Sequence, residues 1–475
     1  MSQSAQSPRG SGAKMPASWF VSSPLLRPAT APPRSRSSWR ARAALSLLAA
    51  AGLLAWQVAA AGAAHAKGGV LDPTFGVGGK VTTQFDSAYD QAAALVVQGD
   101  KLVVAGTGGS ETISAFALAR YSLDGSLDPT FGVGGRVKTD FGPANDQAAA
   151  LVMQGDRLVA AGYTQAFPET FNLDVALARY QPDGSLDPNF GVGGKVITDF
   201  GGDDRATAAV ALSGGKLVVA GFTGIGAGQP DVILARYNVD GSLDSSFGTG
   251  GKVISNVPGI EQAFALAVQA DGKLVAAGMA GPLGSGDLNQ NFALARYNAD
   301  GSLDSSFGTD GTVDTDIGGR TNDQVNALVV QADGKLVAAG TAADPFTGRS
   351  DTALARYNAD GSLDRMFGTG GTVRTDIGAG DFDEARALAV QANGWLVTAG
   401  FAVTEGNFDF ALARYRFNGG LDRSFGVGGT VRTDFWGSTD SAAALAVQAD
   451  GKLVAAGFAN IGGDADFAVA RYNAS

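Results

Sequence analysis

A six-residue motif, Leu-Asp-x-x-Phe-Gly, recurs along most of the chain at nearly constant intervals. Successive copies begin 56 to 60 residues apart, so the chain consists of seven copies of one unit. The copies begin at Leu71, Leu127, Leu186, Leu243, Leu303, Leu363 and Leu421. A period of this length indicates a repeat architecture, in which each unit buries its apolar surface against its neighbours.

Each unit contains two patterns that predict β-strands. The inner pattern, "ALAVQADGKLVAAG" at 265–278, indicates two short strands joined by a tight Asp-Gly turn. The outer pattern, "FALARYNADGSLDSSFGTDGTVDTD" at 292–316, indicates a strand, a Gly-rich loop and a second strand. Residues 67–475 show no sustained helical periodicity, so each unit is expected to hold four strands and no helix.

Seven units of four strands predict an all-β fold, a seven-bladed β-propeller. The strands of each blade are called A to D, from the axis outward. An all-β solenoid is the alternative, but β-helix coils are much shorter than these units. The first unit opens with a lone fourth strand near Lys80–Phe85, and the last unit ends at Tyr472 after a third strand. Pairing these two strands would complete the seventh blade and remove two exposed sheet edges.

The loop between strands C and D is predicted to form the same corner in every copy. In "DGSLDSSFG" the Asp-Gly pair makes the turn, and Leu303 and Phe307 are expected to anchor the loop to its blade. Repetition in all copies favours a structural corner over an active site.

The strings "FALARYNADGSLDSSFGTDG" and "VQADGKLVAAG" resemble the delta-60 repeat family of exported bacterial propeller-like proteins. The resemblance covers essentially all of residues 67–475. It implies a β-propeller in an exported protein, and it brings no established activity or site. The first copy departs at "GDKLVVAG" and the sixth at "YRFNGGLD", which lacks the turn aspartate.

Residues 1–66 have the composition of an export signal. They contain basic residues but no Asp or Glu, and the apolar run "AALSLLAAAGLLAWQVAAAGAA" ends near the small-x-small site Ala64-His65-Ala66. We expect cleavage after Ala66 and a periplasmic or secreted propeller over 67–475, with an uncleaved signal anchor as the alternative.

The composition excludes several kinds of chemistry. The chain has no Cys, and its only His is His65, inside the predicted signal. Ser-His-Asp and Cys-His catalysis, ordinary zinc sites and His- or Cys-ligated haem are therefore excluded from residues 67–475. The formal net charge of −11 argues against nucleic-acid and anionic-membrane partners, and we expect a monomer with no obligatory cofactor.

The loops between strands B and C differ in every copy, whereas the A–B and C–D loops repeat. Because loops of an antiparallel blade alternate between its two faces, the variation is confined to the face shared by the B–C and D–A loops. Variable loops on a rigid scaffold are typical recognition sites, although such loops can also be simple connections. The B–C loops are "TGGSETISA", "YTQAFPETFNLD", "FTGIGAGQPD", "MAGPLGSGDLNQN", "TAADPFTGRSD", "FAVTEGNFD" and "FANIGGDAD".

Two charged positions recur in every copy. A carboxylate precedes or begins each innermost strand, at Asp90, Asp146, Asp204, Glu261, Asp323, Asp383 and Asp440. An arginine stands near the end of each third strand, at Arg120, Arg179, Arg236, Arg296, Arg356, Arg414 and Arg471. The seven acids could form a ring that binds a hard cation such as Ca²⁺, but backbone capping and Arg–Asp ties between blades are the favoured interpretation.

The sequence is compatible with three functions. The preferred one is an exported, non-catalytic binding or scaffold module that recognises an extracellular protein or glycan through the B–C/D–A face. A carboxylate glycosidase or lyase is the second, with Asp203, Glu384 and Glu405 as acids outside the repeated set. A spacer or surface-coat protein without a specific ligand is the third. Trp395 and Trp436 are expected to be packing residues, with sugar stacking as the alternative.

Overall fold

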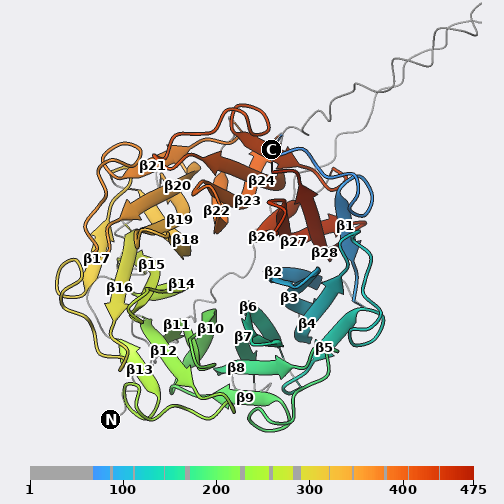
Figure 1. The fold of residues 1–475 in the computed structure, drawn as a ribbon, viewed down its shortest axis with the longest axis vertical. Helices are drawn as coiled ribbons and strands as arrows, with labels where there is room; N and C mark the ends of the chain where they lie inside the picture. Colours follow the sequence, from blue (N-terminus) through green and yellow to red (C-terminus); the bar gives the residue numbers. More distant parts are fainter. Residues whose placement is uncertain are drawn as a thin grey trace, which may run out of the picture. The chain divides into compact units, whose positions relative to one another are not determined.

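The repeat units fold into strands joined by turns and loops, with no helix among the described residues (Figure 1). The structure is a computed structural model that describes residues 68–85, 89–110, 113–143, 145–165, 172–224, 230–255, 260–281, 290–319, 321–344, 347–378, 382–404, 406–437 and 439–474. In these ranges no helix has the length and apolar character needed to cross a membrane. The predicted export signal lies outside the described residues and stays a prediction.

The strands form seven blades of four antiparallel strands around a common axis (Figure 1). A single parallel bridge between Tyr89 and Ala465 joins blade 1 to blade 7. The innermost strands, A, are β2 (Tyr89–Gln98), β6 (Asp146–Gln154), β10 (Asp203–Ala211), β14 (Gln262–Val268), β18 (Asn322–Val330), β22 (Asp383–Val390) and β26 (Asp440–Val447). The B strands are β3 (Lys101–Gly109), β7 (Arg157–Gln165), β11 (Leu217–Gly224), β15 (Leu274–Ala280), β19 (Leu336–Ala343), β23 (Leu396–Thr404) and β27 (Leu453–Ile461).

The outer half of each blade holds a long and a short strand. The C strands are β4 (Ser114–Tyr121), β8 (Leu173–Tyr180), β12 (Asp231–Tyr237), β16 (Asn291–Tyr297), β20 (Ser350–Tyr357), β24 (Asn407–Tyr415) and β28 (Asp464–Tyr472). The D strands are β5 (Arg136–Thr139), β9 (Lys195–Thr198), β13 (Lys252–Ser255), β17 (Thr312–Thr315), β21 (Thr372–Thr375), β25 (Thr430–Thr433) and β1 (Lys80–Thr83). Blades 1 to 6 follow chain order from β2, and blade 7 contains β26, β27, β28 and β1.

The predicted closure of the ring between the two ends is confirmed. The first strand, β1, pairs antiparallel with β28, from Lys80 opposite Ala470 to Thr83 opposite Phe467. The outer edge of β28 is thereby covered, and blade 7 has the same four strands as the others.

The hydrophobic core is divided into layers between neighbouring blades. Between blades 4 and 5, Phe292 and Phe307 pack with Leu336 and Tyr357, and all four side chains are fully buried. The second and third strands are rich in Ala, which allows adjacent sheets to approach closely. Each blade therefore depends on both of its neighbours for burial.

A buried hydrogen bond connects each blade to the one before it. The tyrosine that ends each C strand donates its hydroxyl to a Thr or Ser on the D strand of the preceding blade, as Tyr297 does to Ser255 at 2.7 Å. The remaining pairs are Tyr121–Thr83, Tyr180–Thr139, Tyr237–Thr198, Tyr357–Thr315, Tyr415–Thr375 and Tyr472–Thr433. A polar hydroxyl in the core is satisfied at each interface.

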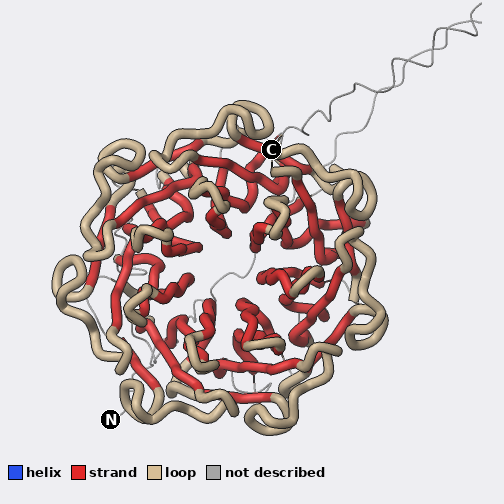
Figure 2. Tube along the Cα trace, in the orientation of Figure 1, coloured by secondary structure: helices blue, strands red, loops and turns tan. Residues whose placement is uncertain are grey.

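The C–D loops lie at the outer rim of the ring (Figure 2). The Phe307 side chain of one such loop is fully buried, and Leu303 packs against the core, as the sequence predicts. Gly308 follows with φ of 54° and donates its N–H to the carbonyl of Asp360 in the next copy at 2.8 Å. A Cβ on Gly308 would lie 2.1 Å from the Thr312 carbonyl oxygen, so the turn requires glycine.

Candidate functional site

The repeated arginines hold the C–D corners in place. In blade 4, Arg296 Nε lies 2.7 Å from Asp304 Oδ2, and its guanidinium stacks 4.6 Å from the centre of the Phe307 ring. The carboxylate partner is the aspartate of the Leu-Asp-x-x-Phe-Gly motif and not the acid of the inner strand. The equivalent pairs are Arg120–Asp128, Arg179–Asp187, Arg236–Asp244, Arg356–Asp364, Arg414–Asp422 and Arg471–Asp72.

The same guanidinium also reaches the next copy. Arg296 Nη1 donates to the carbonyl of Ala359, and the other six arginines make the corresponding bond. Their acceptors are the carbonyl oxygens of Leu123, Pro182, Val239, Ala299, Phe417 and Ala474. The connection between blades thus runs from guanidinium to backbone, while the Arg–Asp pair itself stays within one unit, except where ring closure joins Arg471 to Asp72.

A lysine from the A–B turn completes this arrangement in several blades. Lys273 Nζ lies 2.6 Å from Asp304 Oδ2. Hydrogen bonds from Lys273 and Ser306, together with the Arg296 charge, outweigh burial and hold the pKa of Asp304 well below its usual range. In blade 6 Trp395 replaces the lysine, and its ring lies 5.0 Å from the Arg414 guanidinium. Trp395 is thus a stacking partner of a structural arginine.

The acids of the inner strands are buried connectors. Six of them are aspartates with exposed fractions of at most 1%. Each accepts, on Oδ2 and at 2.5–2.7 Å, the backbone N–H of a residue that follows the D strand of the preceding blade. The donors are Phe85, Phe141, Phe200, Ile317, Ile377 and Phe435. Glu261, the seventh acid, precedes β14 and is half-buried. The seven acids therefore do not form an exposed ring of carboxylate oxygens.

Burial makes the charged form of these aspartates unfavourable. It raises the pKa of Asp90, Asp146 and Asp383 to about 6 and that of Asp440 to about 7. Nearby acids of the same blade junction add to the rise, as Asp376 does for Asp383. The charge repulsion on each inner-strand aspartate therefore comes from acids at its own blade junction and not from the other members of the predicted ring. Binding of a cation by the ring as a whole stays a prediction.

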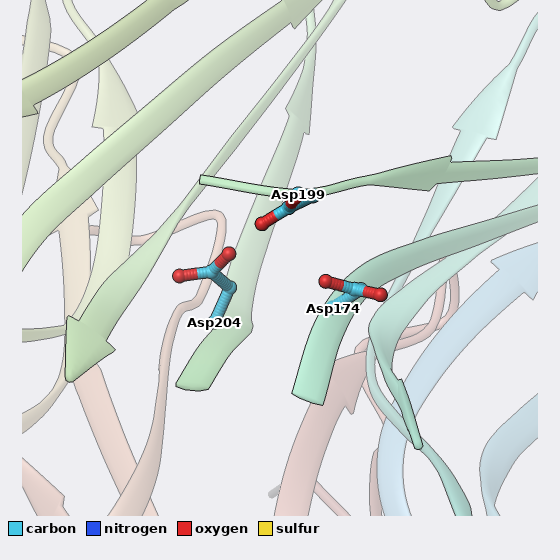
Figure 3. A group of neighbouring side chains, drawn as sticks. All are labelled: Asp174, Asp199 and Asp204. Carbon is cyan, nitrogen blue, oxygen red and sulfur yellow. The ribbon is translucent and has the colours of Figure 1, made fainter. Parts of the chain in front are cut away.

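Two blade junctions gather three carboxylates at one point. The Asp174 cluster consists of Asp174 at the start of β8, Asp199 after β9 and Asp204 at the start of β10, turned toward one another (Figure 3). One oxygen from each lies within 4.8 Å of the others. The Asp409 cluster (Asp409, Asp434 and Asp440) has the same geometry between blades 6 and 7. Sequence reasoning found Asp204 and Asp440 and missed their partners.

Two groups, each built around an arginine found in only one copy of the repeat, lie toward the B–C/D–A face. In the Arg205 group (Tyr163, Arg205, Phe222 and Phe264), the guanidinium lies 5.2 Å from the Tyr163 ring centre and 5.9 Å from that of Phe222. In the Arg386 group (Glu384, Arg386, Phe401 and Phe408), Arg386 lies 4.9 Å from the Phe401 ring centre, and its Nε lies 3.2 Å from Glu384 Oε1. Departure from the repeat is the signal that could have found them.

The other acids considered for catalysis are engaged or undescribed. Asn326 Nδ2 donates to Glu384 Oε1 at 3.1 Å, and Asp203 Oδ1 accepts the Leu173 N–H at 3.2 Å. Glu405 lies outside the described residues, as do parts of most B–C loops. Trp436, 57% exposed with φ of 110°, stands on the same face beside Lys80, whose Nζ lies 5.1 Å from the ring centre.

The opposite face carries a hollow of about 550 Å³ between blades 1 and 2. Its walls include Arg120, Asp128 and Pro182, which form the corner contact described above, together with Gln98 and Asp156. The hollow is thus bounded mainly by residues that hold adjacent repeats together.

Seven antiparallel blades closed by the pairing of β1 with β28 define a repeat β-propeller. The chain belongs to the family described as a domain of unknown function (DUF5122) beta-propeller. The family model matches residues 98–131, 154–190, 213–247, 269–307, 331–367, 391–425 and 448–475. No curated protein matches the sequence.

Several solved structures are similar to this chain at low identity. Sqt1 of Chaetomium thermophilum, bound to the N-terminus of ribosomal protein L10, is 14% identical with a TM-score of 0.47, covering 82% of this chain and 98% of that one. A family PL25 ulvan lyase, bound to a GlcA–Rha3S glycan, is 14% identical with a TM-score of 0.47, covering 83% and 96%. A gluconolactonase of Xanthomonas campestris is 13% identical with a TM-score of 0.33, covering 67% and 91%.

Proposed function

We propose that this chain is an exported, non-catalytic binding propeller whose B–C/D–A face recognises an extracellular glycan or protein. The observation that carries the proposal is the contrast between its two faces. The A–B/C–D face repeats one Arg–Asp contact in all seven blades, whereas the B–C/D–A face carries the Arg205 and Arg386 groups and an exposed Trp436. Residues that break an otherwise strict repeat are candidates for a role other than folding.

The chemistry of these residues favours a glycan that bears carboxylate or sulfate groups. Aromatic rings supply faces on which sugar rings can stack. A planar guanidinium binds a carboxylate or sulfate through two parallel hydrogen bonds. Arg386 is 38% exposed at its side chain, so part of it is accessible to such a ligand. The resemblance to exported delta-60 repeat proteins supports an extracellular setting.

Binding of labelled protein to an array of neutral, uronic-acid and sulfated glycans tests the proposal, with a parallel pull-down from extracellular proteins. We expect Arg205→Ala/Arg386→Ala to weaken binding of any captured ligand at least tenfold. The control, Arg365→Ala/Arg423→Ala, removes two exposed arginines from the C–D loops of the other face and should leave binding unchanged. Equal loss in both variants, or no loss in either, would refute the assignment of this face.

A further inference from the structure

The Asp174 cluster combines negative charge with burial. Asp204 has no exposed surface and Asp174 is 9% exposed, while Asp199 lies at the surface. Three carboxylates so close together repel one another unless a positive charge lies between them.

Unpartnered oxygens are the second, independent observation. Within the part of the chain that the structure describes, Asp174 Oδ1 is buried and makes no hydrogen bond. Asp204 Oδ2 accepts the Phe200 N–H at 2.5 Å, and an Asp199 oxygen accepts the Gly201 N–H at 2.6 Å. Buried carboxylate oxygens are normally satisfied, so the bare Asp174 oxygen points to a partner that binds in the cluster.

A third junction shows an arginine paired with the counterpart of one of these acids. Between blades 5 and 6, Arg374 Nη2 lies 2.7 Å from Asp351 Oδ2, where Asp351 is the counterpart of Asp174. Arg374 lies opposite Ala353 on β20, and the corresponding residue, opposite Ala176 on β8, is Ile197. The Asp174 cluster therefore has the carboxylates without the guanidinium.

Lys252, which lies beside this cluster, does not replace that guanidinium. Lys252 Nζ donates to the backbone carbonyl of Asp199 at 3.0 Å and lies 5.3 Å from the Phe200 ring centre. Its bond is to the main chain and not to a carboxylate oxygen. In the Asp409 cluster, by comparison, burial and the Asp434 charge raise the pKa of Asp409, and the Arg432 charge partly offsets this rise.

We propose that Asp174, Asp199 and Asp204 bind a hard divalent cation of the Ca²⁺ class at the junction of blades 2 and 3. Ca²⁺ takes oxygen ligands at about 2.3–2.6 Å, so two ligands on opposite sides of the ion lie about 4.8 Å apart. The cluster's oxygens lie within 4.8 Å of one another and fit one coordination sphere. Water completes the shell on the exposed Asp199 side. The site lies on the B–C/D–A face but does not depend on a glycan or protein ligand there.

Calorimetric titration of the EDTA-treated full chain with CaCl₂ tests this site, alongside thermal melting in EDTA and in 10 mM CaCl₂. We expect binding with a Kd of about 10⁻⁴ to 10⁻³ M, as in extracellular calcium modules, and a higher melting temperature with Ca²⁺. Asp174→Asn/Asp204→Asn should abolish both effects. Asp351→Asn, in the junction that Arg374 neutralises, is the matched control and should retain both.

Ile197→Arg separates cation binding from folding. It places a guanidinium at the position of Arg374, so it should remove Ca²⁺ binding while the protein melts in EDTA at or above the wild-type temperature. Ca²⁺ binding that survives both Asp174→Asn/Asp204→Asn and Ile197→Arg would overturn the proposal. So would the absence of heat and of any melting shift with CaCl₂ in the folded wild type.

Discussion

The buried contact between Arg296 and Asp304 should be among the most sensitive points of the fold. Arg296→Met keeps an apolar side chain of similar length but removes the guanidinium, which is 2.7 Å from Asp304 and 3.1 Å from Gln269. It also leaves the Ala359 carbonyl without its donor. Breaking a buried ion pair by removing one partner costs about 3–5 kcal/mol. Because Lys273 remains 2.6 Å from Asp304, we expect Arg296→Met to lower the free energy of unfolding by about 3 kcal/mol, at the lower end of that range.

The lysine provides the internal test of this reasoning. Lys273 is partly exposed, so Lys273→Met alone should cost about 1 kcal/mol. In Arg296→Met/Lys273→Met, Asp304 loses both cations, and we expect about 5 kcal/mol, more than the sum of the single losses. Blade 6 offers a natural counterpart, since Trp395 replaces the lysine. Arg414→Met should therefore approach the double variant, with only the exposed Arg416 left 3.6 Å from Asp422.

Differential scanning calorimetry at pH 7 and low salt measures these differences. For a propeller of about 400 residues, an unfolding entropy of about 2 cal/mol/K per residue converts 1 kcal/mol into roughly 1 °C. The expected losses are about 3 °C for Arg296→Met, 1 °C for Lys273→Met and 5 °C for both changes. Arg365→Met, at an exposed arginine of the C–D loops, controls for loss of charge alone. Additive losses, or a loss below 1 °C for Arg296→Met, would refute the argument.

The remaining predictions concern a buried acid, a core hydroxyl and the closing strand. Because burial raises the pKa of Asp383 to about 6, the folded state holds the extra proton between about pH 4 and 6, and the stability from this group falls as pH rises through that window. Between pH 4 and 8, the melting temperature of Asp383→Asn should fall less steeply with pH than that of the wild type. The same pH dependence in both proteins would contradict this. Tyr297→Phe should lower stability by about 1 kcal/mol in the same assay, since the buried Ser255 hydroxyl loses its donor, and no change would show that water replaces it. Deleting residues 68–83 uncovers the edge of β28 and should produce dimers or aggregates in light scattering; a monomer that melts like wild type would exclude this role of β1.

The periodic features of the fold could be predicted from the sequence. Seven equal units fix the number of blades, and the incomplete first and last units predict the pairing of β1 with β28. Leu303 and Phe307 could be recognised as anchors because apolar residues at fixed loop positions have few other roles. These predictions rest on spacing along one unit, which the sequence displays directly.

The contacts between units could not be predicted in the same way. The carboxylate partner of each arginine depends on how the C–D loop folds back, because the motif Asp and the inner-strand Asp stand at equally regular positions. The Asp174 cluster joins residues from β8, from the loop after β9 and from β10, and the presence of Ile197 in place of an arginine matters only once the register is known. Sequence periodicity conveys the structure of one blade and not the offset between neighbours.

The pairing of β1 with β28 also constrains the order in which the protein can fold. Asp72 and Arg471, which bond across this closure, are 399 positions apart, so the closing blade cannot form until the last strand of the chain is available. Closing so long a loop is entropically expensive and slow compared with forming hairpins within one blade. Blades 1 to 6 can assemble progressively, with β1 unpaired at one end. We therefore expect the closing blade to form late, and mutations in β1 or β28 to slow folding out of proportion to the few residues that they contain.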